Sequence, residues 1–126
     1  MDSKDVLAAL VILYVEDDHV VRPNVGKFLR RRCKMVIEAA NGKEGLDEYV
    51  ANRPDVVITD IEMPIMNGIE MIDKILIINE NQVIIITTAY NDIEHKSNRV
   101  CKNLIKPIIR EQMIEAIVEC VLNSKK

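Results

Sequence analysis

Three apolar runs that lack polar alternation place the strongest limit on the fold of this chain. They cover residues 11–15, 56–59 and 83–87 and are rich in Val and Ile. A strand with one face in water alternates apolar and polar residues, whereas a strand covered on both faces does not. Weaker runs at residues 35–38 and 103–105 bring the expected strands to five. The sequence therefore predicts a parallel sheet with helices on both faces.

Segments with a helical period lie between these strands. Their apolar residues fall on one face in three groups: Val21, Val25, Phe28 and Leu29; Ile69, Ile72 and Leu76; and Ile114, Ile117, Val118 and Val121. Start signals agree, because Pro23 suits a first helical turn, Asn41 is a good N-cap residue, and Asn67 precedes Gly68. Residues 91–102 are polar, so we expect a short helix or an irregular loop there. The alternation indicates an α/β fold with a doubly wound five-stranded sheet, a flavodoxin-like three-layer sandwich.

Length and charge limit the classes of function. The 126 residues suit one domain, and we expect residues 1–126 to form it. The net charge is -3, with 17 basic and 20 acidic residues spread evenly, so the chain lacks the concentrated basic face of a nucleic-acid-binding protein. The basic cluster at residues 30–34 fits the last turn of a helix.

The cysteines and the apolar runs bear on the compartment. Cys33, Cys101 and Cys120 are odd in number and form no C-x-x-C motif, so we expect reduced thiols. The apolar run at residues 6–15 is too short to span a bilayer, and residues 1–5 lack the positive charge of a signal peptide. We expect a soluble, cytoplasmic protein.

Residues with useful chemistry end the apolar runs. Glu16 and Asp17 follow the first run, Asp60 follows the run at 56–59, Thr88 the run at 83–87, and Lys106 the last run. Ligands of open parallel sheets bind beyond the carboxyl ends of the strands. If the strands lie in the order 2-1-3-4-5, the four strands that carry these residues are neighbours. The residues then meet in one pocket.

Three carboxylates in one pocket require positive charge. Each close pair repels by about 4 kcal/mol at an effective dielectric constant near 20. Oxygen ligands without histidine or thiolate select a hard cation, and we expect Mg²⁺ bound by Glu16, Asp17 and Asp60, while Lys106 supplies a second positive charge. Asp60 is the best candidate for a nucleophile toward phosphorus, because it alone directly ends the central strand.

Two further groups complete the expected site. The Thr88 hydroxyl is placed to donate to a phosphoryl oxygen. Pro64 and Gly68 give the loop after Asp60 an unusual path, which turns the backbone carbonyl of Glu62 toward the metal.

With these motifs in place, the chain resembles the receiver domain of two-component response regulators over almost its whole length. Glu16-Asp17 is similar to the acidic pair of that family, and Thr-Asp60-Ile-Glu-Met-Pro-Ile-Met-Asn-Gly to its phosphoacceptor loop. Thr88-Ala89 is similar to the family's switch hydroxyl, and Lys106-Pro107 to its lysine. Single motifs are unspecific, but four in this order and spacing are very specific. The resemblance implies the order 2-1-3-4-5 and a cis bond at Lys106-Pro107.

The resemblance also implies a mechanism and partners. A histidine kinase or a phosphotransfer protein gives a phosphoryl group to Asp60, with Mg²⁺ held by Asp17, Asp60 and the Glu62 carbonyl, and by Glu16 through water. The added charge reshapes the surface near the last strand and changes the binding partner, a downstream protein or an output domain. The chain is then not an enzyme, because it accepts the group onto itself and at most loses it slowly.

The chain departs from the family at its usual output face. Asn103 occupies the place where the family usually has an aromatic residue, three residues before the lysine. The segment between Thr88 and Lys106 is about one helical turn shorter than usual. Our hypothesis is that the family's fourth helix, which we expect between Thr88 and Lys106, is truncated or mobile here. We also expect Tyr90 to replace the missing ring and to slow loss of the phosphoryl group.

Two alternatives belong to other classes of function. The Asn103 change favours a receiver-fold scaffold that binds a partner without phosphorylation. A magnesium phosphohydrolase with an aspartate nucleophile usually shows Asp-x-Asp after its first strand, and Glu16-Asp17-Asp18 does not fit. For Asp18 and His19 we expect helix capping, and for Thr87 a continuation of its strand.

Overall fold

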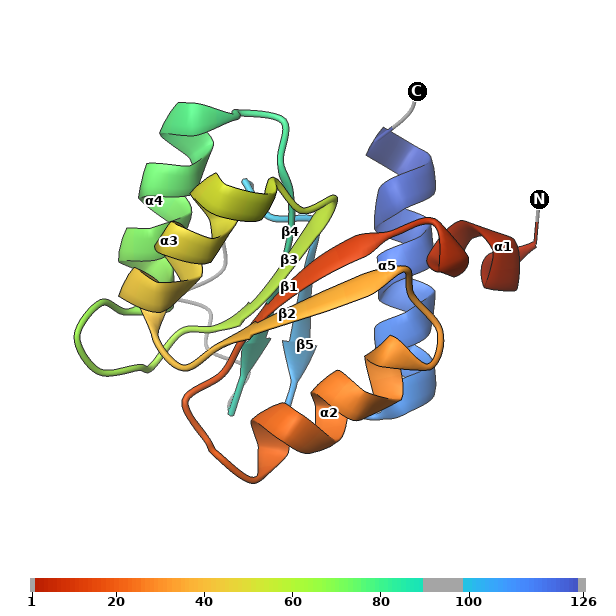
Figure 1. Cartoon of the computed structure of the whole chain (residues 1–126), viewed down its shortest axis with the longest axis horizontal. Coiled ribbons are helices and arrows are strands. Elements are labelled where there is room, and N and C mark those ends of the chain that lie inside the picture. Colours follow the sequence, from red (N-terminus) through yellow and green to blue (C-terminus); the bar gives the residue numbers. More distant parts are fainter. Residues whose placement is uncertain (1, 90–98, 125–126) are drawn as a thin grey trace.

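A five-stranded parallel sheet forms the centre of the molecule (Figure 1). The computed structural model describes residues 2–89 and 99–124. The sheet has the order β2-β1-β3-β4-β5, with β1 (Val11–Val15), β2 (Met35–Ala39), β3 (Val56–Asp60), β4 (Val83–Thr88) and β5 (Lys102–Ile105). The helices are α1 (Ser3–Ala8), α2 (Val21–Arg30), α3 (Gly42–Asn52), α4 (Gly68–Ile78) and α5 (Arg110–Ser124). The predicted fold class and strand order are confirmed.

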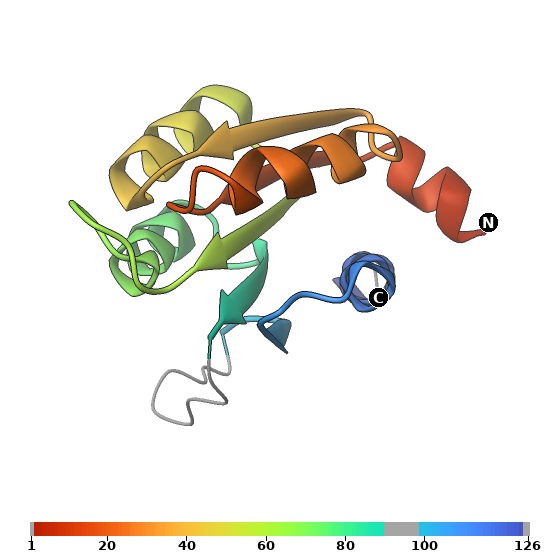
Figure 2. The same cartoon turned by 90° about the horizontal axis from the view of Figure 1, so that it is seen from below.

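Helices cover both faces of the sheet, which explains the unbroken apolar runs. Figures 1 and 2 show α3 and α4 on one face, and α2 and α5 on the other. Ile12 and Tyr14 of β1 pack on the α2 and α5 side, while Leu13 and Val15 pack on the α3 and α4 side. All four side chains are fully buried. Burial of such a side chain stabilises the fold by about 1.5–3 kcal/mol, so neither face tolerates a polar residue easily.

The strand register sets where the site residues emerge. Asp60 pairs with Thr87, and Thr88 pairs with Ile105. The strands extend up to one residue beyond the predicted bounds, so Asp60 and Thr88 lie inside β3 and β4 as their last residues. The carboxyl ends of the strands therefore lie level with one another at one edge of the sheet.

Helix starts follow the predicted capping signals. The side-chain oxygen of Asn41 accepts from the Glu44 amide at 2.9 Å, and that of Asn67 accepts from the Glu70 amide at 2.9 Å. Pro23 lies in the first turn of α2, as predicted. Asp18 accepts from the amides of Val20 and Val21 at 2.8 and 3.0 Å. Asp18 therefore binds two amides at the start of α2, although the N-cap residue is Val20, and no such contact involves His19 among the described residues.

Helix α1 was not predicted. Its start is capped by Asp2, which accepts from the Asp5 amide at 3.0 Å. Val6 and Leu7 are buried in the cluster formed with α5. A six-residue helix contains too little periodic pattern to separate it from the following apolar run. No helix in the described part of the chain is both long and apolar enough to cross a bilayer.

The expectation of three reduced thiols was wrong for two of them. Cys101 and Cys120 form a disulfide with a Cα–Cα distance of 6.0 Å, while Cys33 is free. The chain reverses direction between β5 and α5, which brings these distant positions together. Sequence spacing alone does not reveal that alignment. The cis bond at Lys106-Pro107 is present as expected. The prediction for Tyr90 lies outside the described residues, as does most of the short helix or irregular loop predicted for residues 91–102. Of that segment, residues 99–101 form a turn, and Lys102 already belongs to β5.

Candidate functional site

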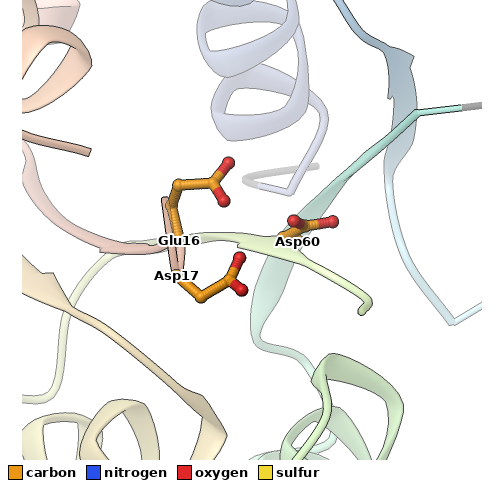
Figure 3. A group of neighbouring side chains, drawn as sticks. All are labelled: Glu16, Asp17 and Asp60. Carbon is orange, nitrogen blue, oxygen red and sulfur yellow. The ribbon is translucent and has the colours of Figure 1, made fainter. Parts of the chain in front are cut away.

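Carboxylates from two neighbouring strands meet beside Lys106. Glu16 follows β1, and its amide donates to the Ala39 carbonyl at 3.0 Å, which extends the sheet pairing by one residue. Asp60 ends β3 and is 8% exposed. Figure 3 shows the carboxyl groups of Glu16 and Asp17 pointing toward Asp60. Four of the residues that the sequence assigned to one pocket, Glu16, Asp17, Asp60 and Lys106, thus come from separate elements to one place.

Lys106 bridges the two buried carboxylates. Its Nζ donates to Glu16 Oε1 at 2.7 Å and to Asp60 Oδ2 at 2.9 Å. The Glu16 side chain is 1% exposed, and that of Lys106 is 25% exposed. Such charge-assisted hydrogen bonds are stronger than neutral ones, and they compensate for the removal of the carboxylates from water.

Burial is the largest single influence on the pKa of Glu16 and on the pKa of Lys106. Burial raises the pKa of Glu16, although its hydrogen bond from Lys106 acts in the opposite direction. For Lys106, burial lowers the pKa, but the hydrogen bonds to Glu16 and Asp60 outweigh it and raise the pKa overall. Lys106 therefore stays an ammonium across the physiological range.

The acidic group fits a hard divalent cation. One oxygen each from Glu16, Asp17 and Asp60 lies within 4.8 Å of the others. Oxygens on opposite sides of a Mg²⁺ ion, each at about 2.1 Å, are about 4.2 Å apart, so small side-chain movements suffice. With Lys106 counted, three carboxylates and one ammonium leave a local charge of minus two. Glu62 lies two residues after Asp60 in an exposed loop position.

The loop after Asp60 follows a path that requires a glycine at position 68. The Gly68 amide donates to the Ile61 carbonyl at 2.9 Å. A Cβ on Gly68 would overlap the carbonyl oxygen of Asp60. Ile65 has a φ of 71°, a left-handed conformation that is uncommon for a β-branched residue. The loop is therefore held tightly against the end of β3.

Arg22 is a site residue that sequence reasoning missed. Its Nη1 donates to the Glu16 carbonyl oxygen at 2.8 Å, and its Nε lies 3.9 Å from a Glu38 oxygen. Arg30 also pairs with Glu38, so an ion-pair network ties α2 to β2 beside the site. An arginine in the first turn of a helix resembles an ordinary surface cation in the sequence, so no signal there revealed its contact with Glu16.

The end of β4 is joined to Lys106 through the backbone. The Lys106 amide donates to the Thr88 carbonyl at 2.7 Å. Thr88 is half-buried, whereas Thr87 is fully buried within the strand, as predicted. Within the described residues, the hydroxyls of Thr87 and Tyr14 have no hydrogen-bond partner. Burial, followed by the charges of Glu16 and Asp60, raises the pKa of Tyr14, so its hydroxyl remains neutral.

The sequence matches the family model of the response regulator receiver domain over residues 12–118. The chain belongs to this family. Sporulation initiation phosphotransferase F of Bacillus subtilis strain 168 is 31% identical over 110 residues, which cover 84% of this chain and 89% of that protein. A solved response regulator receiver domain protein from Clostridium thermocellum is 28% identical, with a TM-score of 0.82, and covers 91% of this receiver and 96% of its own chain.

Some relatives of the receiver are much longer. The cyclic di-GMP phosphodiesterase of Thermotoga maritima is 36% identical over 85 residues. The match covers 68% of this receiver but 23% of that protein. The receiver therefore corresponds to about a quarter of the longer relative, and the activity named for that relative belongs to the whole of it.

Proposed function

We propose that residues 1–126 act as one phosphoacceptor domain, in which Asp60 takes a phosphoryl group from a histidine kinase or a phosphotransfer protein. The observation that carries this proposal is the bridge from Lys106 to Asp60 at 2.9 Å and to Glu16 at 2.7 Å. An ammonium held against a nearly buried aspartate offsets negative charge that arrives on that aspartate. A purely structural ion pair would not need a third carboxylate, Asp17, in the same group.

The transfer requires one bond to form and one to break. An Asp60 carboxylate oxygen bonds to phosphorus while the bond from phosphorus to the donor nitrogen breaks, and the electron pair stays on the nitrogen. Lys106 keeps its proton and donates to the incoming phosphoryl oxygens. The Thr88 hydroxyl, at the end of the neighbouring strand, donates to another phosphoryl oxygen. The domain accepts the group onto itself and is not a turnover enzyme, apart from slow self-dephosphorylation.

The proposed metal ligands are Asp17, Asp60 and the Glu62 backbone carbonyl, with Glu16 acting through water. When bound, Mg²⁺ neutralises charge on the phosphoryl oxygens. The oxygen-only donor set and the local charge of minus two support this choice of ion.

An apolar groove of about 580 Å³ beside Lys106 is the proposed contact surface for the phosphodonor. Val21 and Phe28 of α2 form one wall, and Pro107 and Ile108 form the other. A donor helix that lays apolar residues in this groove would bring a phosphohistidine to the same edge of the sheet as Asp60. Phosphorylation then changes the surface near β5 and its binding partner, in a cytoplasmic signalling pathway.

The test is incubation with acetyl phosphate and Mg²⁺, followed by intact mass measurement. We expect the mass of one added phosphoryl group, which is absent without Mg²⁺ and absent in Asp60→Asn. Asp47→Asn is the matched control, because it makes the same change on the exposed surface of α3, and it should react like the original chain. Equal modification of Asp60→Asn would refute Asp60 as the acceptor, and no modification of any chain would leave the receiver-fold scaffold that binds a partner without phosphorylation.

A further inference from the structure

The disulfide closes a covalent ring around the segment that supplies Lys106. Cys101 immediately precedes β5, and Cys120 lies in α5, 19 positions later in the chain. The ring therefore contains all of β5, Lys106, Pro107 and the first ten residues of α5. The disulfide closes this ring, and Lys106, inside the ring, contacts the carboxylates of the site.

The disulfide is open to attack from solvent. Both cysteines line a surface pocket of about 310 Å³, together with Arg99, Asn81 and Asn123. Cys101 is an exposed residue, whereas Cys120 is 2% exposed. An external thiolate therefore approaches from the Cys101 side, and Cys120 is placed as the leaving group.

The start of β5 is hydrogen-bonded to β4, whereas its non-covalent contacts to α5 are weak. The Cys101 amide donates to the Ile84 carbonyl at 2.8 Å. Lys102 Nζ lies 3.4 Å from Glu119 Oε1, and both side chains are about half exposed, so the ion pair contributes little stability. Strand β5 has four residues and pairs with β4 at the edge of the sheet. The disulfide is thus the strongest tether between β5 and α5 among the described contacts.

We infer that Cys101 and Cys120 form a thiol–disulfide exchange site for a dithiol reductant, and that this exchange controls how firmly β5 and Lys106 are held. The first thiolate of the dithiol bonds to Cys101 Sγ, the Cys101–Cys120 bond breaks, and the electron pair leaves on Cys120 Sγ, which takes a proton. The second thiol of the dithiol displaces Cys101 as a thiol. The protein gains two electrons and two protons, and the dithiol becomes a disulfide.

The proposed compartment supports a switching role over a permanent one. Disulfides in cytoplasmic proteins are usually transient or redox-sensing. Reduction removes the ring, so local openings that separate β5 from α5 become on the order of a hundredfold more populated by the loop-closure relation. Because Lys106 directly follows β5, these openings reach the ammonium that contacts Asp60.

The test uses the Cys33→Ser chain, which keeps only the pair. Cys33 is half-buried and outside the ring, so this substitution leaves the pair intact. The chain is treated with dithiothreitol or with oxidised glutathione, and thiols are counted by maleimide labelling and intact mass. We expect no labelled thiol after oxidation, two after reduction under native conditions, and full recovery of the disulfide on return to oxidised glutathione.

Hydrogen exchange measures the structural consequence. Amides of residues 101–106 should exchange on the order of a hundredfold faster after reduction, while those of β1 stay unchanged. Cys101→Ser/Cys120→Ser in the same background should show the fast rate under both conditions. A disulfide that resists dithiothreitol until the whole chain unfolds, thiols that do not pair again, or equal exchange in both redox states would overturn the inference.

A phosphorylation readout depends on the proposed function and is kept separate. The lifetime of the phosphoryl group on Asp60 should differ between the oxidised and reduced chains, and not between redox conditions in the double serine variant. If no chain accepts a phosphoryl group, the proposed function fails, while thiol counting and hydrogen exchange still decide the inference about the disulfide.

Discussion

Replacement of Lys106 by methionine isolates the electrostatic role of the bridge. Methionine keeps most of the apolar length of lysine but removes the ammonium. Glu16, with its side chain 1% exposed, then remains beside Asp60, and no other cation of the described residues contacts its carboxylate. We expect Lys106→Met to destabilise the receiver strongly at pH 7.5 in buffer without divalent ions.

The size of the loss follows from the contact distances. At an effective dielectric constant of 20, unit charges at the distances of 2.7 and 2.9 Å attract by about 6 kcal/mol each. Breaking a buried ion pair costs about 3–5 kcal/mol after desolvation is included. Lys106 is one-quarter exposed, so water replaces part of its contact. We therefore expect a loss of about 2–3 kcal/mol in the free energy of unfolding.

Urea unfolding followed by circular dichroism measures this loss. Lys43→Met is the matched control, because Lys43 forms only an exposed pair with Asp47, and its loss should stay below about 0.5 kcal/mol. The double variant Glu16→Gln/Lys106→Met should recover at least half of the loss, because the unpaired charge is then gone. Equal stability of the single and double variants would refute the view that the buried Glu16 charge causes the loss.

The pH dependence of the stability loss in Lys106→Met tests the role of the Glu16 charge independently. Burial raises the pKa of Glu16, and removal of the Lys106 hydrogen bond, which lowers it, raises it further. A folded-state pKa above the unfolded value of about 4.3 means that the folded state binds more protons. The loss should therefore shrink as the pH falls through the raised folded pKa, and reach its minimum below about pH 4.3. A loss in the free energy of unfolding that grows as the pH falls would contradict this expectation.

Three further measurements test separate features. Gly68→Ala should lower the free energy of unfolding by about 1–3 kcal/mol, because a Cβ there overlaps the Asp60 carbonyl and the backbone must shift; a stability gain in urea unfolding would contradict this. Burial raises the pKa of the Cys33 thiol to about 11, so iodoacetamide should label Cys33 at pH 8 far more slowly in the folded chain than in urea. Mg²⁺ should raise the melting temperature, measured by calorimetry, and Asp17→Asn should remove most of that gain without lowering stability in metal-free buffer.

Sequence pattern predicted the fold well because both faces of the sheet are covered. The unbroken runs at β1, β3 and β4 are typical of strands covered on both faces, and Asn41 and Asn67 marked the helix starts. The predicted end of β3 is one residue short. Asp60 has a low β-propensity, and yet it continues the strand pairing with Thr87. Tertiary contacts, which a local pattern does not contain, decide that last pair.

The sequence predicted the charged side chains that meet in the candidate site, but not the residues that hold them in place. Carboxyl ends of neighbouring parallel strands must meet, so the strand order that the family resemblance implies was enough to place Glu16, Asp60 and Lys106 together. Arg22 contacts a backbone oxygen of Glu16, and backbone partners have no residue type that a sequence could reveal. The Cys101–Cys120 pair depends on how β5 aligns with α5 in space, which a local sequence pattern does not contain.

The placement of charges among the strands predicts which part of the receiver responds to the proposed phosphorylation of Asp60. Glu16 follows β1 and Asp60 ends β3, and each of these strands is paired on both sides. Lys106 follows β5, which is paired on one side only and is covalently tied to α5. Added charge on Asp60 therefore acts between a fixed carboxylate and an ammonium on the edge strand. Since fewer backbone hydrogen bonds hold the edge strand, movement should begin at Lys106 and β5, and the disulfide should limit its extent.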